Sequence, residues 1–143
     1  MRSRFSVLQR SKVHSAMPAT SVSSMSCSTP YDHVAYPSRP FAHTQPHYLA
    51  TVAHWYGMTP VSPSQCRVLE LGCGSGGNLA PMAYRAPQSE FVGIDLSSRA
   101  IESGRAMIRA LGLTNISLHH RDIMDVSEAD GRFDYIVAHG VYS

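Results

Sequence analysis

The chain has 143 residues, of which 43% are hydrophobic and 15% charged, with a formal net charge of +2. This balance suits one domain with a hydrophobic core. The small charge gives no argument for nucleic acid as a partner, and no apolar run approaches the length of a membrane span. Cys27, Cys66 and Cys73 lack metal-binding spacing, so the sequence predicts no metal site and no disulfide framework. It favours a reducing compartment, and we expect a cytoplasmic protein.

Residues 1–30 differ in composition from the rest. Four basic residues fall in the first dozen, serine recurs, and no acidic residue precedes Asp32. This composition resembles an organelle transit peptide, but it also fits an unstructured tail or translation that begins at Met25. Because the segment lacks apolar periodicity, we expect a disordered and dispensable tail.

The residues that follow predict an irregular arm and then a helix. Prolines prevent a helix over residues 31–45. Residues 46–56 favour a helix that begins at Pro46 and stops at Gly57. Its expected apolar face consists of Leu49, Val52, Ala53 and Tyr56.

The stretch from Arg67 to Asn78 organises the chain. An apolar run predicts a buried strand over residues 66–71, and four glycines follow it within six residues. Glycine accepts positive φ and lets the backbone come close to a ligand. A helix is expected over residues 77–85. A strand, a glycine turn and a helix start are typical of a site for a nucleotide or similar polar ligand.

Three further strands are expected downstream. They cover residues 91–94, 116–120 and 133–138, and a helix capped by Ser97 or Ser98 separates the first two. Its expected apolar face is Ile101, Gly104, Ile108 and Leu111, and Gly112 is its expected stop. Strands alternating with helices predict an α/β fold, a Rossmann-like doubly wound parallel sheet. Right-handed crossovers place the helices mainly on one face.

The glycines allow two interpretations. Gly72, Gly74 and Gly77 fit the dinucleotide fingerprint G-x-G-x-x-G. Glu70 with Gly72, Gly74 and Gly76 fits acidic-x-G-x-G-x-G, the first motif of class I methyltransferases that use S-adenosylmethionine (SAM). A carboxylate at the strand end suits a ligand that carries an ammonium and a sulfonium, and it would repel a pyrophosphate.

Three acidic residues stand at three successive strand ends: Glu70, Asp95 and Asp122. Asp95 follows Gly76 by 19 residues, the spacing of a carboxylate that binds ribose hydroxyls. Asp122 could accept a hydrogen bond from an adenine amine, and Ile123 could cover the adenine face. Each is also compatible with an ordinary turn aspartate or core isoleucine.

These blocks resemble class I SAM-dependent methyltransferases. The resemblance rests on Val68–Gly76, Gly93–Ser97 and Arg121–Ile123. Further blocks resemble a bacterial subgroup whose methyltransferase domain precedes a methyltransferase regulatory domain: residues 36–41, 77–83 and 139–143. The resemblance implies that residues 31–143 are the N-terminal part of a SAM-binding methyltransferase domain.

The resemblance also implies residue roles. Glu70 and the turn formed by Gly72, Cys73, Gly74 and Gly76 would hold the methionine end of SAM. Asp95 would bind the ribose, Leu96 would lie against the adenine, and Asp122 with Ile123 would hold it. His139 would face the methyl-transfer site, and Tyr36 would close over SAM. The sequence identifies neither a general base nor the methyl acceptor.

Family members continue after the fourth strand with a fifth strand and a hairpin, which this sequence lacks. We therefore expect a truncated chain, without methyl transfer on its own, that self-associates through an uncovered sheet face. The alternatives are an NAD-binding fragment of an oxidoreductase and a non-catalytic fragment that docks on a partner.

Overall fold

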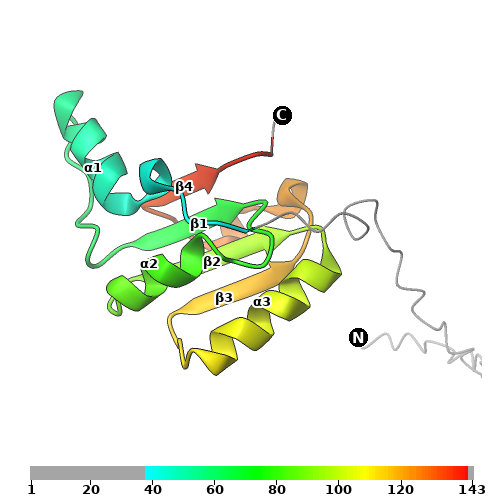
Figure 1. Ribbon diagram of the computed structural model, residues 1–143. Coiled ribbons are helices and arrows are strands. Elements are labelled where there is room, and N and C mark those ends of the chain that lie inside the picture. The colour runs from blue at the N-terminus through cyan, green and yellow to red at the C-terminus, as the bar shows by residue number, and fades with distance from the viewer. Residues whose placement is uncertain (1–37, 142–143) are drawn as a thin grey trace, which may run out of the picture.

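The computed structural model describes residues 38–141 and contains a four-stranded parallel sheet (Figure 1). The strands are β1 (Arg67–Leu71), β2 (Glu90–Asp95), β3 (Ile116–His120) and β4 (Tyr135–Ala138). Their order in the sheet is β3-β2-β1-β4. This order confirms the predicted doubly wound sheet, in which the chain crosses back after β3 to place β4 beside β1. The predictions for residues 1–30, Met25 and Tyr36 lie outside the described residues.

The helices close to the sheet share one of its faces, as expected. These are α2 (Leu79–Arg85) and α3 (Ser98–Ala110), which lie on the same side in Figure 1. The side chain of Ser97 caps α3 by accepting a hydrogen bond from the Ala100 N–H, and Gly112 with φ of +65° follows its end. The larger core cluster lies between these helices and the strands, with Phe91 and Leu79 fully buried in it.

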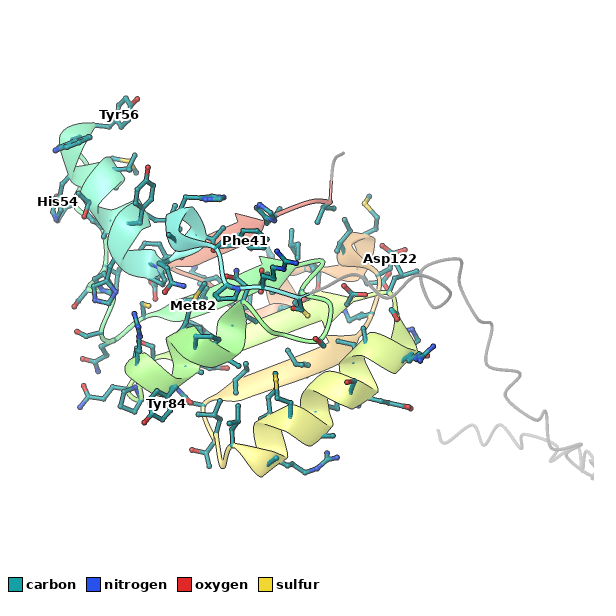
Figure 2. The ribbon with its side chains drawn as sticks, in the orientation of Figure 1. Phe41, His54, Tyr56, Met82, Tyr84 and Asp122 are labelled. Carbon is teal, nitrogen blue, oxygen red and sulfur yellow. The ribbon has the colours of Figure 1, made fainter. Side chains whose placement is uncertain are left out.

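The first helix, α1 (Pro46–Trp55), follows the short 3-10 helix η2 (Ala42–Thr44). It joins the same core cluster through Ala50 and Leu49. The expected apolar face was only partly right, because Tyr56 is 82% exposed. Figure 2 shows Tyr56 at the end of α1 that points away from the sheet. The C-terminal end of α1, where Trp55 is also 85% exposed, therefore does not pack against the domain.

The expected apolar face of α3 also needs one correction. Ile101, Gly104 and Ile108 are buried, but Leu111 is 58% exposed. Leu111 follows the last residue of α3, so the helical periodicity no longer determines where its side chain points.

Within the part of the chain that the structure describes, no helix combines the length and apolarity needed to cross a membrane.

The face of the sheet opposite α2 and α3 is better covered by other residues than expected. Leu69 and Ile94 are 1% and 2% exposed, and they pack with Val92, Val126 and Phe133. The link between β3 and β4 forms two short 3-10 turns, η3 (Ile123–Asp125) and η4 (Glu128–Asp130). It is held by an Arg121–Asp130 ion pair of 2.6 Å and by Arg67, whose guanidinium lies 4.4 Å from the centre of the Phe133 ring. On the edge strand β4, Ile136 remains 62% exposed.

Candidate functional site

The carboxyl end of β1 lies where the strand order reverses. β1 pairs with β2 on one side and with β4 on the other, both in parallel. In open α/β sheets, ligands bind beyond the strand ends at this reversal point. The glycine turn follows β1 directly, so the sequence places it at the position where such a site is expected.

The backbone of the turn requires its glycines. Gly72, Gly74 and Gly76 have φ values of +70°, +55° and +73°. Side-chain-bearing residues rarely adopt this conformation. The backbone N–H groups of Gly72 and Cys73 both donate to the Ile94 carbonyl, at 2.8 and 3.0 Å. The turn is therefore anchored to the end of β2.

Two glycines outside the turn allow α3 and β2 to pack closely against it. A Cβ added to Gly104 in α3 would lie 2.5 Å from the Ser75 carbonyl oxygen. A Cβ added to Gly93 in β2 would lie 2.7 Å from the Cys73 sulfur. Neither glycine was among the predicted site residues. A glycine inside a strand or helix often indicates close approach of another backbone, so the positions of Gly93 and Gly104 could have indicated this packing.

Cys73 has a packing role in this turn. Its side chain is 4% exposed and lies against Gly93. Burial, with Glu70 and Asp95 nearby, raises the pKa of the Cys73 thiol well above its usual range. The thiol is therefore not set up as a reactive thiolate.

Asp95 lies at the end of β2 and faces the turn. One carboxylate oxygen accepts from the Gly74 N–H at 2.7 Å, and the other accepts from the Ser97 N–H at 2.8 Å. Asp95 thus joins the glycine turn to the start of α3. The proposed ribose role of Asp95 stays a prediction.

Glu70 is the acidic residue buried at the end of β1, with 4% exposure. Its Oε1 accepts from Asn78 Nδ2 at 2.8 Å, while Oε2 has no hydrogen-bond partner among the described residues. Burial raises the pKa of Glu70 to about 7, although the Asn78 hydrogen bond acts in the opposite direction. An unpaired buried carboxylate oxygen costs free energy unless a donor reaches it. Beside a glycine turn, this arrangement fits a cationic group such as the ammonium of SAM.

The predicted adenine residues lie at the neighbouring strand ends. Leu96, which is half-buried, follows β2, and its carbonyl contacts His120 Nε2 at 3.0 Å. Asp122 follows β3, where its Oδ1 accepts from the Met124 N–H at 2.9 Å and starts η3, which contains the half-buried Ile123. Figure 2 places Asp122 at the opposite end of the molecule from Tyr56. The adenine contacts of Leu96, Asp122 and Ile123 stay predictions.

A segment upstream of η2 reaches the site through contacts of Ser38 and Phe41, which the sequence did not predict. Ser38 Oγ accepts from the Gly77 N–H at 2.8 Å. The Phe41 ring stacks on the His139 ring with 3.7 Å between centroids, and His43 lies 5.4 Å from His139. His139 follows the last residue of β4, as predicted. The two ring contacts join residues about 100 positions apart, so no local pattern in the sequence indicates them.

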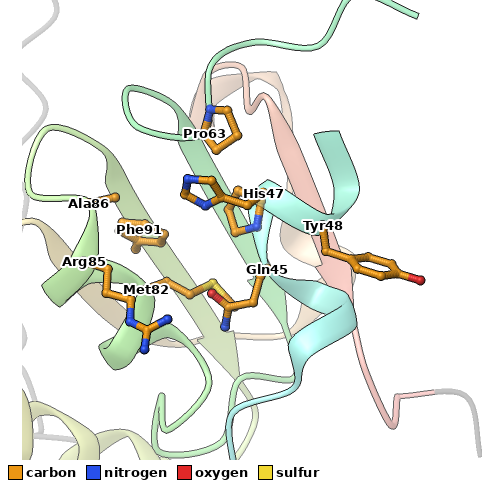
Figure 3. Close-up of a pocket in the computed structure, with 9 residues that line it drawn as sticks. Gln45, His47, Tyr48, Pro63, Met82, Arg85, Ala86 and Phe91 are labelled. Atoms are coloured by element: carbon orange, nitrogen blue, oxygen red, sulfur yellow. The ribbon is translucent and has the colours of Figure 1, made fainter. Parts of the chain in front are cut away.

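A separate hollow of about 400 Å³ lies beside α1 and α2 (Figure 3). Met82, Phe91 and Pro63 line it, together with Gln45, Pro46, His47, Tyr48, Arg85 and Ala86. The Tyr48 side chain points away from the other labelled side chains. None of the predicted cofactor residues lines this hollow.

A family model described as a methyltransferase domain matches residues 62–143, more than half of the chain. The chain belongs to this methyltransferase family. Protein RP789 of Rickettsia prowazekii (strain Madrid E), itself uncharacterized, is 46% identical over 114 residues, with 80% of this chain and 21% of RP789 covered. Uncharacterized protein RP028 of the same strain is 42% identical over 113 residues, with 79% of this chain and 45% of RP028 covered.

A solved structure, PKMT2 from Rickettsia typhi in complex with AdoHcy, has a TM-score of 0.73 and 41% identity. The match covers 76% of this chain and 21% of PKMT2. This methyltransferase chain thus spans about a fifth to just under half of the length of these relatives. The fold is that of class I methyltransferases, and the cofactor of the family is SAM, not NAD. The subgroup with a regulatory domain stays a prediction.

Proposed function

We propose that this chain forms the SAM-binding part of a methyltransferase and presents the methyl group of SAM to an acceptor. The observation that carries the proposal is Glu70 Oε2, a buried carboxylate oxygen without a hydrogen-bond partner among the described residues. It belongs to the strand that leads into a glycine turn with positive φ at three positions. SAM carries an ammonium that could pair with this oxygen, whereas NAD would bring a pyrophosphate toward a carboxylate.

Each residue of the site would hold one part of SAM. Glu70 and the turn from Gly72 to Gly76 would hold the methionine end. Asp95 would bind the ribose, while Leu96, Asp122 and Ile123 would surround the adenine. When bound, SAM supplies a methyl group on an activated sulfonium leaving group. The protein therefore has mainly to align the acceptor with the methyl carbon and to exclude water.

His139 is the proposed residue on the acceptor side. Its ring is half-buried and stacks on Phe41 beyond the end of β4. This placement supports a role in orienting the acceptor. The acceptor itself and a general base are not assigned.

We infer a cytoplasmic location from the cysteines. Cys66 and Cys73 are both free and buried, and burial raises the pKa of both thiols. Free thiols are common in a reducing compartment.

Ligand-induced shifts of the melting temperature test the proposal. S-adenosylhomocysteine (AdoHcy) at about 100 times its dissociation constant should stabilise the chain by about 2.7 kcal/mol, which raises the melting temperature by several degrees. NAD at the same concentration should leave the melting temperature unchanged. Stabilisation by NAD and not by AdoHcy would overturn the proposal.

A further inference from the structure

Asn78 stands directly before α2 and is 3% exposed. Asparagine at a helix start commonly accepts a hydrogen bond from the first turn of the helix. The Asn78 side chain makes no such bond. A buried side-chain amide must find other partners, so its contacts indicate what this residue does.

The contacts of Asn78 reach two segments that are distant in sequence. Its Nδ2 donates to Glu70 Oε1 at 2.8 Å and to Thr44 Oγ1 at 3.0 Å. Its Oδ1 accepts from the Phe41 N–H at 2.9 Å. Thr44 Oγ1 in turn donates to the Phe41 carbonyl at 2.9 Å. One amide thus joins the carboxylate at the end of β1 to the segment from Phe41 to Thr44.

Phe41 extends this connection to the acceptor side. Its backbone is bonded to Asn78, and its ring stacks on His139 at 3.7 Å between centroids. Figure 2 shows Phe41 beside the strands, between η2 and the glycine turn. The path Glu70–Asn78–Phe41–His139 therefore runs from the cofactor side of the site to its acceptor side.

We propose that Asn78 is a positioning residue that couples the SAM-binding carboxylate Glu70 to the placement of Phe41 and His139. Its amide nitrogen donates to the Glu70 carboxylate and favours the ionised form, and its amide oxygen fixes the backbone of Phe41. Binding of SAM at Glu70 then changes the environment of His139. This inference rests on the proposed function, because it assumes that Glu70 binds the ammonium of SAM.

The coupling has an electrostatic consequence. Among the described residues, Asp95 is the titratable group whose charge acts on Glu70, and it favours the protonated form of Glu70. Cys73 lies nearby, but the raised pKa of its thiol leaves it uncharged in this pH range. The Asn78 hydrogen bond opposes the effect of Asp95 and lowers the pKa of Glu70. Removal of the amide should therefore raise the pKa of Glu70 further above about 7. Binding that needs ionised Glu70 would then weaken at a higher pH.

Calorimetric titration with AdoHcy between pH 6 and pH 9 tests the first half of the coupling. Wild-type binding should weaken as pH falls through the pKa of Glu70. Asn78→Ala should weaken binding by on the order of tenfold at neutral pH and move the midpoint of the pH profile upward. Asn78→Asp, which keeps an acceptor for the Phe41 N–H but cannot donate in its ionised form, should also move the midpoint upward.

Asn115→Ala is the matched control. Asn115 Nδ2 donates to the carbonyls of Ala83, Ala86 and Ser89, away from the glycine turn. Its loss should lower the melting temperature without moving the midpoint of the pH profile. An unchanged midpoint in both Asn78 variants would overturn the role of the amide at Glu70.

The NMR resonances of the His139 ring test the second half. They should move when AdoHcy is added to the wild type, and this part of the test uses the wild type alone. Without ligand, they should move in Asn78→Ala, stay nearly in place in Asn78→Asp and stay in place in Asn115→Ala. His139 resonances that respond neither to Asn78→Ala nor to AdoHcy bound by the wild type would overturn the coupling.

The two proposals can fail separately. If the folded wild type binds no AdoHcy at any pH, the proposed function fails. The ligand-free spectra of Asn78→Ala still test the connection from Asn78 to His139, because they do not depend on ligand binding. If AdoHcy binds normally and both the midpoint and the His139 resonances are insensitive to Asn78, only the further inference fails.

Discussion

At the scale of single residues, Glu70 determines much of the chemistry of the site. A carboxylate usually has a lower pKa in a folded protein, but burial raises the pKa of Glu70 from its ordinary value of 4.5 to about 7. The folded state therefore binds a proton more tightly than the unfolded state does. The stability that this proton confers is complete below about pH 4.5 and is lost as pH rises through about 7.

Glu70→Gln should remove this pH dependence. Without ligand, the wild type should lose about 2.5 kcal/mol of unfolding free energy between pH 5 and pH 8 relative to the variant, because glutamine does not ionise. Urea unfolding of both proteins at the two pH values measures the difference. Parallel pH profiles for the two proteins would show that Glu70 ionises freely in the folded state.

Asp95→Ala should weaken AdoHcy binding by about 1–3 kcal/mol, since charged hydrogen bonds would be lost. The same substitution removes the carboxylate that accepts from the Gly74 and Ser97 N–H groups, so the turn should also become less ordered. Glu102→Ala, which removes an exposed carboxylate from α3, is the control. Equal calorimetric affinity for Asp95→Ala and the wild type would rule out the ribose role.

At the scale of elements, local sequence patterns predicted the strands and the glycine turn well. Apolar runs located β1 and β2, and Gly72, Gly74 and Gly76 adopt the positive φ that their spacing suggested. The sequence patterns were wrong where the burial of a residue depends on contacts with other elements. Tyr56 matches the apolar periodicity of α1 but has no core to pack against at that end. A periodic pattern predicts which residues share a face, not whether another element covers that face.

Gly104→Ala in α3 tests how closely the helix supports the glycine turn. Alanine normally favours a helix over glycine by about 1 kcal/mol. Here its Cβ would lie 2.5 Å from the Ser75 carbonyl oxygen and from a Leu118 methyl carbon, so we expect a net loss of about 1–3 kcal/mol in urea unfolding. Ser103→Ala, on the exposed side of α3, should be neutral or slightly stabilising. A stabilised Gly104→Ala protein would show that the turn moves freely away from α3.

At the scale of the whole molecule, the sheet topology and the three acidic strand ends could be predicted from the sequence, because both follow from chain order. The contacts that complete the site could not. The hydrogen bond from Phe41 to Asn78 spans 37 residues, and the stacking of Phe41 on His139 has no local pattern. The link from β3 to β4 also covers Leu69 and Ile94 better than its length suggested, because Val126 and Phe133 pack there.

Self-association is the prediction that belongs to this scale. β4 is an edge strand among the described residues, and Ile136 on it is 62% exposed. Exposed apolar edges favour pairing with another copy. Sedimentation should show self-association of the wild type, and Ile136→Lys should reduce it, whereas Arg109→Lys on α3 should not. A wild type that stays monomeric at high concentration would contradict this prediction.

A crystal structure of the chain with AdoHcy tests the central claim most directly. We expect the ligand at the glycine turn, with its ammonium beside Glu70 Oε2 and its ribose hydroxyls bonded to Asp95. The hollow beside α1 and α2 should remain free of it. AdoHcy bound in that hollow, or at the turn with Glu70 and Asp95 left without ligand contacts, would contradict the account.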